Sequence, residues 1–251
     1  WKQKTQRQLS LKVKSVKKDS IEKHLELFTD YWDATLELGR IPANNEFDFS
    51  DQIRRICGSH NKAHQALLKY FGEEIYMESQ TKRKEDLIVY FALSMFEKRK
   101  AQSKMPESLK RDIKAFFTSY QDALEEARDI LFSVGNTTTI GSACLSAHES
   151  IACGNMEERH SFTFHKNYLG ELPAVLRIYI GCATQLYGDI DEFQLIKAHI
   201  TSGKVSLMRY DDWDKDEPLL LERIKIKLRE LDIDFFDYSG KFEPSPLLNK
   251  D

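Results

Sequence analysis

One stretch predicts the fold class of the C-terminal part of the chain. It is Leu172–Trp213, with the sequence LPAVLRIYIGCATQLYGDIDEFQLIKAHITSGKVSLMRYDDW. Pro173 precedes the apolar segment AVLRIYIGCATQLYG, and proline at a helix start predicts a helix there. KVSLMRY, residues 204–210, alternates apolar and polar residues, which predicts a strand. Further on, LLLERIKIKLREL (219–231) predicts a helix and DIDFFDY (232–238) a second strand. We therefore expect an α+β unit with the order helix-strand-helix-strand.

The residues before this unit show helical periodicity. Apolar residues recur at steps of three and four from Asp19 to Gly39, which predicts one amphipathic helix. Ser50 is positioned to cap a short helix, Gly58 ends it, and a second helix follows up to Gly72. EDLIVYFALSMFEKR, residues 85–99, is apolar on most sides and predicts a buried helix.

The helical region is expected to close with one further helix. Pro106 predicts its start, and an apolar stripe continues to Leu131. Residues 135–170 are small and polar, which favours a short helix within a long connector. The predicted fold is therefore mainly α with a smaller α+β C-terminal part. We expect a helical bundle over residues 1–150 and the α+β domain over 151–251, with a boundary near Cys153.

Composition excludes several classes of protein. With 41% hydrophobic and 31% charged residues, the chain is expected to be globular. Its longest apolar run, Leu87–Phe96, is shorter than the roughly 20 residues of a membrane helix. The four cysteines form no CxxC pair, which argues against a disulfide scaffold and favours a reducing cytoplasm. The chain begins at Trp1 without a signal-like segment, so we expect a fragment or a processed product.

Clusters of basic residues suggest contact with DNA phosphates. The net charge of the whole chain, −3, does not by itself indicate a nucleic-acid partner. Residues 1–18 carry seven lysine and arginine residues and no acid. The predicted phosphate contacts are Lys12, Lys14, Lys17, Lys18, Lys82 and Arg83. The alternative is a solvated charged segment, which is the commoner role of such runs.

The segment DQIRRICGSHNKAHQALLKYF, residues 51–71, has the layout of a helix-turn-helix. Lys62, Gln65 and Lys69 are the polar residues of its second helix that we expect to reach DNA. The alternative is ordinary helix packing around a glycine turn, because this layout alone has a high false-positive rate.

Two further patterns contain residue types that bind metals. Cys57, His60 and His64 have the spacing C-x-x-H-x-x-x-H, which fits part of a tetrahedral zinc site. A fourth ligand is not evident, so a buried cysteine beside two capping or solvated histidines is favoured. The acids around Asp189 and Asp211 are better explained as caps and turns than as cation ligands. We predict no metal.

Catalytic patterns are few. His165 and His199 are isolated, and either serves as a general base only if a partner lies nearby in the fold. The sequence has no GxGxxG after a strand, no GxxxxGK[ST] and no nucleophile elbow. We therefore expect no catalytic residue and no cofactor in this chain, and whether it acts as an enzyme stays open.

Four blocks carry a resemblance to a known family. They are RKEDLIVYFALSMFEKRK (83–100), MPESLKRDIKAFFTSY (105–120), the stretch 172–213 and KLRELDIDFFDY (227–238). Together they resemble the C-terminal half of bacterial DNA phosphorothioation-associated methyltransferases. The resemblance implies an upstream Rossmann-like domain that binds S-adenosylmethionine, which this chain lacks. It also implies a role in DNA modification and in defence against foreign DNA.

The leading hypothesis is an accessory C-terminal region of such a methyltransferase that engages DNA or partners of the same defence system. One alternative is a protein-interaction module without DNA contact. Another is a cryptic nuclease in residues 151–251 that uses His165, His199 and nearby carboxylates.

Overall fold

A computed structural model describes residues 18–97, 104–240 and 242–247. The chain divides into two compact units between Lys84 and Glu85. This division differs from the boundary expected near Cys153. The helices just before Cys153 pack with the C-terminal sheet or with the helix beside it, so they belong to the second unit.

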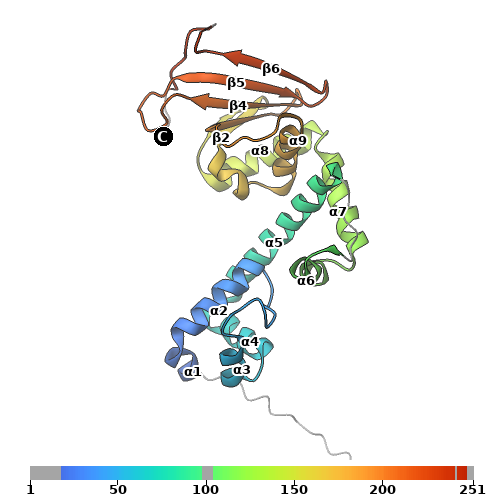
Figure 1. Ribbon diagram of the computed structural model, residues 1–251, viewed down its shortest axis with the longest axis vertical. Coiled ribbons are helices and arrows are strands. Elements are labelled where there is room, and N and C mark those ends of the chain that lie inside the picture. Colours follow the sequence, from blue (N-terminus) through green and yellow to red (C-terminus); the bar gives the residue numbers. More distant parts are fainter. Residues whose placement is uncertain (1–17, 98–103, 241, 248–251) are drawn as a thin grey trace, which may run out of the picture. The chain divides into compact units, whose positions relative to one another are not determined.

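The first unit is helical (Figure 1). Its helices are α1 (Lys18–Lys23), α2 (Leu25–Leu38), α3 (Ser50–Cys57), α4 (His60–Phe71) and the first part of α5 (Glu73–Leu93). Its core is built from apolar and aromatic side chains of α1 to α4, among them Phe28, Tyr31, Ile53 and Leu67. Burial of these side chains stabilises helices that are individually too short to persist in water.

Two details of this unit differ from the sequence prediction. The single helix expected from Asp19 is interrupted at His24, whose φ of −128° and ψ of 38° are not helical. Ser50 is not a cap, because it lies inside α3 and its hydroxyl donates to the Phe47 carbonyl at 2.7 Å. Ser59 is the cap of α4 and accepts from the Lys62 amide at 3.2 Å.

The second unit begins with the end of α5, and its described residues contain four further α-helices. These are α6 (Glu107–Phe116), α7 (Tyr120–Ser133), α8 (Thr137–Ile151) and α9 (Ala174–Tyr187), with 3₁₀ turns at Ser94–Phe96 and Lys166–Glu171. The one helix expected after Pro106 is two, because the chain leaves helical geometry at Phe117 and Ser119 caps α7. The connector expected over residues 135–170 begins with α8, which Asn136 caps, and continues into two strands and a 3₁₀ turn. Pro173 precedes α9 as predicted.

The second unit also contains a six-stranded antiparallel sheet in the order β1-β2-β3-β4-β5-β6. Its strands are β1 (Asn155–Glu157), β2 (Ser161–His165), β3 (Leu195–His199), β4 (Lys204–Tyr210), β5 (Leu220–Lys227) and β6 (Asp232–Asp237). Strands β4 and β6 were predicted, and the mainly α class with a smaller α+β part is confirmed.

The helix predicted over residues 219–231 is wrong, because most of this segment is strand β5. Leucine, glutamate, arginine and lysine favour helices, but Ile224 and Ile226 alternate with charged residues as a strand requires. They pair with Leu207 and Val205 of β4 and are fully buried. The order helix-strand-helix-strand therefore does not describe this unit.

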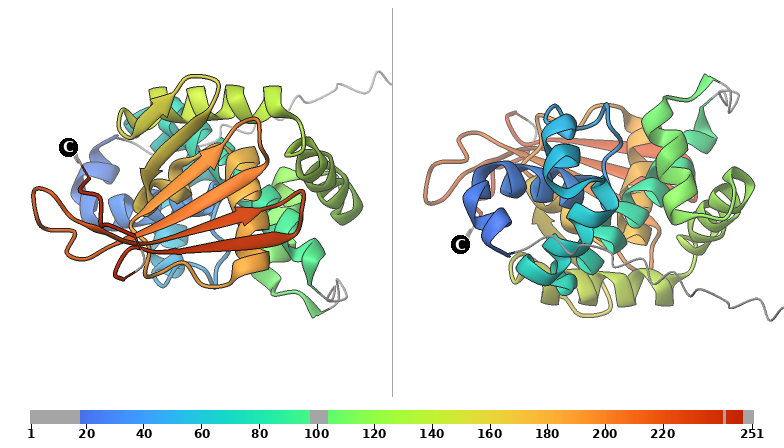
Figure 2. Two further views of the ribbon diagram at one scale, coloured as in Figure 1. Left: turned by 90° about the horizontal axis from the view of Figure 1, so that it is seen from above. Right: turned by 90° about the horizontal axis from the view of Figure 1, so that it is seen from below.

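The two faces of the sheet have different surroundings. Helices α8 and α9 cover one face, and apolar side chains from alternate positions of β2 to β5 meet them in the largest buried cluster. Figure 2 (left) views the sheet from the other side, with these helices behind it. We call this second side the open face. No helix in the described ranges is long and apolar enough to cross a membrane.

Candidate functional site

The open face presents positively charged side chains from three neighbouring strands. Side chains alternate along a strand, so the residues between the buried ones point to the open face. One cross-strand row runs Thr163, Lys197, Ser206, Lys225 and Asp234. Lysines of β3 and β5 thus flank a serine of β4.

The neighbouring rows add further basic residues. We call the whole set the basic face, and its members are Lys197, His199, Lys204, Arg223, Lys225 and Lys227. They come from β3, β4 and β5, which are adjacent in the sheet. Charges that are far apart in sequence are therefore gathered on one surface.

Some of these cations are paired with acids. The Lys197 ammonium lies 2.8 Å from a carboxylate oxygen of Glu157. The Lys227 ammonium lies 2.9 Å from a carboxylate oxygen of Asp232 and 2.8 Å from one of Asp234. These two lysines are therefore largely neutralised.

Three cations of the basic face are not paired in this way. Within the described part of the chain, Lys204, Arg223 and Lys225 have no carboxylate at ion-pair distance. The pKa of Lys225 is lowered by burial and by the nearby charges of Arg223 and Lys204. Mutual repulsion of this kind marks a surface where a bound anion would be favourable.

His199 is embedded among these lysines. Its Nε2 lies 3.0 Å from the Ser206 hydroxyl. Burial, together with the positive charges of Lys197 and Lys225, lowers the pKa of His199 to about 4. The imidazole is therefore neutral at pH 7 and contributes a hydrogen-bonding group but no charge.

The His199–Ser206 pair does not form a nucleophilic site. The Ser206 side chain is only 2% exposed, so a substrate cannot approach its hydroxyl. His165 lies against Trp213 at the other end of the sheet, with ring centroids 5.0 Å apart. It pairs with Leu195, four residues along β3 from His199, which corresponds to roughly 13 Å. The two histidines proposed for a cryptic nuclease are therefore not brought together.

An aromatic cluster borders the basic face. It consists of Arg223, Phe236, Tyr238 and Phe242. The guanidinium carbon of Arg223 lies 4.6 Å from the centre of the Phe236 ring and 5.9 Å from that of Tyr238. Phe242 packs on both rings at 6.2 and 5.5 Å. The basic surface thus continues into two half-buried aromatic rings and the exposed ring of Phe242.

The described residues among those predicted to bind DNA lie in the first unit. Lys62, Gln65 and Lys69 are exposed along one side of α4, so the structure does bring these three together. On α5, Lys82 is exposed and Arg83 is half-buried. Lys12, Lys14 and Lys17 lie outside the described residues, and Lys18 is the first residue of α1, with a side chain that is not described.

The proposed zinc ligands lie in the core of the first unit. His60 Nδ1 is 2.7 Å from the Pro42 carbonyl oxygen, and His64 packs edge-on against Tyr76 with ring centroids 4.5 Å apart. Burial raises the pKa of Cys57 to about 11, which opposes the thiolate that zinc requires. In the described ranges, no group of three or more His, Cys, Asp or Glu side chains could hold a metal ion.

The acidic residues serve as turn and cap groups, as predicted. Asp189 accepts from the Asp191 amide at 3.0 Å, and Asp211 accepts from the Leu219 amide at 2.8 Å. The Lys215 ammonium and this amide lower the pKa of Asp211 to about 2. These carboxylates are held by local hydrogen bonds.

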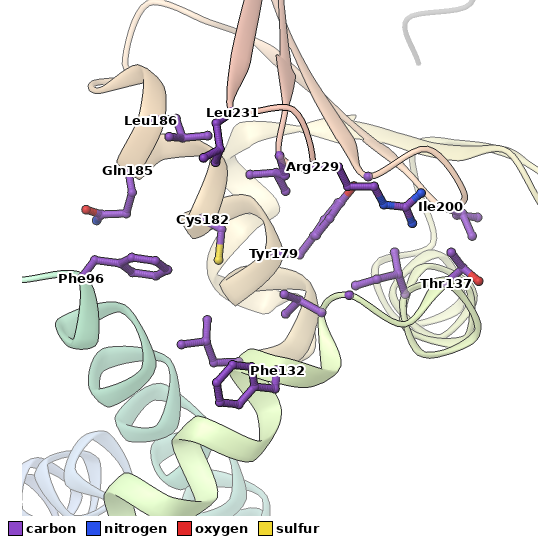
Figure 3. A pocket seen from close by; sticks show the side chains of 16 residues that line it. Phe96, Phe132, Thr137, Tyr179, Cys182, Gln185, Leu186, Ile200, Arg229 and Leu231 are labelled. Carbon is purple, nitrogen blue, oxygen red and sulfur yellow. The ribbon is translucent and has the colours of Figure 1, made fainter.

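A separate apolar pocket of about 610 Å³ lies on the helical side of the second unit (Figure 3). Its walls come from α7, α8, α9 and the turns that follow β3 and β5. The exposed side chains of Phe96, Phe132 and Leu231 surround it, and Arg229 is the charged residue in its lining. Phe132 is 76% and Leu231 73% exposed, so large apolar side chains border the opening of the pocket.

The comparisons with known proteins identify no relative: no family model, no curated protein and no solved structure matches the chain. The assignment of the site therefore rests on its geometry. Sequence reasoning missed the basic face, although Arg223-Ile-Lys-Ile-Lys227 alternates cations with isoleucines. That alternation was the available signal for a strand with one buried and one basic side.

Proposed function

We propose that this chain is the accessory C-terminal region of a DNA methyltransferase associated with phosphorothioation and that its basic face contacts DNA. The observation that supports DNA contact is a group of three cations on neighbouring strands, Lys204, Arg223 and Lys225, which have no carboxylate partner among the described residues. Phosphate oxygens are the anions that such a surface is best suited to bind along a strand.

The same proposal accounts for the placement of the family-like sequence. The stretch 172–213 forms α9, β3 and β4, and so supplies Lys197, His199 and Lys204 to the basic face. The block 227–238 contains β6, which is the edge strand of the sheet at the opposite side from β1.

S-adenosylmethionine is assigned to residues outside this chain. The sheet is antiparallel at every described pairing. Rossmann-like folds bind nucleotides and related cofactors in a crevice at the carboxyl ends of parallel strands. This antiparallel sheet has no such crevice. In this proposal the chain positions DNA, or a partner, for a catalytic domain that it does not contain.

Duplex binding at low and moderate salt tests DNA contact. We expect measurable affinity that falls as salt rises, since counterions compete for the phosphates. The variant Lys225→Gln should weaken binding, whereas Lys114→Gln, on exposed α6, should not. Affinity that is absent, or that does not respond to salt, would overturn the proposal.

The apolar pocket favours a second function, docking of another defence-system protein. A segment with an apolar side chain for the pocket and a carboxylate facing Arg229 would match both the walls and the charge. Pull-down with candidate partners, repeated with Leu231→Asp, tests this. Leu231 is 73% exposed, so the substitution should leave the fold intact while it abolishes capture. Capture that is unchanged by Leu231→Asp would exclude this pocket as the docking site.

A further inference from the structure

We infer that the aromatic cluster beside the basic face stacks unpaired bases, so that the chain binds single-stranded DNA in preference to duplex. This inference rests on the proposed function, because the basic face would hold the backbone of the same strand. It adds the chemical class of the ligand, a nucleotide whose base is free to leave the duplex stack.

The first argument is the combination of groups. Proteins that bind single strands combine a cationic surface for the phosphates with aromatic rings for the bases. Here Lys225 lies on the basic face and its ammonium is 5.4 Å from the centre of the Phe236 ring. A phosphate contact and a base contact are therefore available side by side on this surface.

The second argument is the state of Arg223. Its guanidinium lies over Phe236 and beside Tyr238, and no carboxylate in the described residues is at ion-pair distance from it. Its Nε is buried and has no hydrogen-bond partner among these residues. Buried donors of this kind are uncommon in folded proteins. A guanidinium that lies over an aromatic ring and has no carboxylate partner among the described residues keeps its positive charge available for a nearby phosphate.

The third argument is exposure. Phe242 is 49% exposed and forms the outer member of the cluster, and Phe236 is half-buried beneath it. A base in duplex DNA has both its faces covered by its neighbours, so it cannot use such a ring. An unpaired base can, and each stacked base contributes about 1–3 kcal/mol of binding free energy.

The test compares three labelled ligands by fluorescence anisotropy on the whole chain: a short oligo(dT), an abasic strand of equal length and a duplex. The abasic strand keeps the phosphates and removes the bases. We expect oligo(dT) to bind at least about fivefold more tightly than the abasic strand, as expected for one stacked base. It should also bind more tightly than the duplex.

Two variants assign the effect to the cluster. Phe242→Ala removes an exposed ring, and Phe236→Leu keeps apolar volume while it removes the aromatic face. Both should bring the affinity for oligo(dT) down to that for the abasic strand. Phe235→Ala is the matched control, because Phe235 is 65% exposed and lies on the opposite face, near Tyr187. Circular dichroism of each variant checks that the fold is retained.

The outcomes separate this inference from the proposal beneath it. Equal, salt-dependent affinity for oligo(dT) and the abasic strand would overturn base stacking and leave phosphate binding in place. Tighter binding of duplex than of oligo(dT) would also overturn it. Absence of binding to all three ligands would overturn both the inference and DNA contact.

Discussion

Neutralising two lysines of the basic face should reduce the salt dependence of DNA binding by a calculable amount. Lys204, Arg223 and Lys225 are the cations of this face without a carboxylate partner among the described residues. Each phosphate contact contributes about −0.9 to the slope of log affinity against log salt on duplex DNA. Three contacts give a slope of about −2.7, which corresponds to a loss of about 40-fold in affinity between roughly 50 and 200 mM salt.

The double variant Lys204→Gln/Lys225→Gln should leave one such contact. Its slope should be near −0.9, so the same change in salt should reduce affinity only about 3–4-fold. Glutamine keeps most of the side-chain stem and removes the charge. Because nearby cations and burial disfavour the charged form of Lys225, the variant should be at least as stable as the parent. Thermal denaturation followed by circular dichroism measures this.

The assay is equilibrium binding of a labelled duplex at several salt concentrations. Lys110→Gln/Lys114→Gln on α6 removes the same charge from a different surface and should keep the parent slope. Lys62→Gln/Lys69→Gln tests the exposed side of α4 in the same way. A parent slope in the sheet variant, with a reduced slope in the α4 variant, would refute our assignment and favour the helix-turn-helix.

Three further predictions concern the second unit. Gly181→Ala should lower the free energy of unfolding by about 1–3 kcal/mol in chemical denaturation, because its Cβ would lie 2.6 Å from Leu93 Cδ2. Tyr179→Phe should cost about 1 kcal/mol in the same assay, since the hydroxyl lies 2.9 Å from the His199 carbonyl oxygen and 3.0 Å from that of Lys204. The unfolded state binds a proton at His199 near pH 6.5 and the folded state only near pH 4, so stability should fall as pH drops through this window. Chemical denaturation at several pH values measures this loss of stability, and His199→Gln should reduce it by about 1–2 kcal/mol, a figure that allows for solvent screening. An unchanged dependence of stability on pH in this variant would contradict a neutral His199.

The elements that sequence analysis found are those with strong local signals. Pro173 marks the start of α9, and alternation in residues 204–210 marks β4. Strand β5 was mistaken for a helix because its residues are good helix formers and the sheet overrides that preference. Helix α8 was underestimated because the residues it turns toward the sheet include the small Ala143, Cys144 and Ala147, which give little hydrophobic signal.

The candidate site was harder to predict than the fold class. Basic residues at the start of the chain are contiguous in sequence, so they were the obvious candidates. Lys197 and Lys225 are 28 positions apart and meet only through their common neighbour Ser206. Such a row depends on strand pairing, and sequence analysis did not include β3 or β5 as strands.

The core and the basic face are set by the same register. Ile224 and Ile226 enter the core because Lys225 and Lys227 lie between them on the open face. A shift of one residue in β5 would bury these lysines and expose the isoleucines, at a cost of several kcal/mol for each buried charge. The hydrophobic effect that holds the sheet on α8 and α9 therefore also holds the cations in place. Strand pairing thereby fixes the backbone positions from which these cations extend.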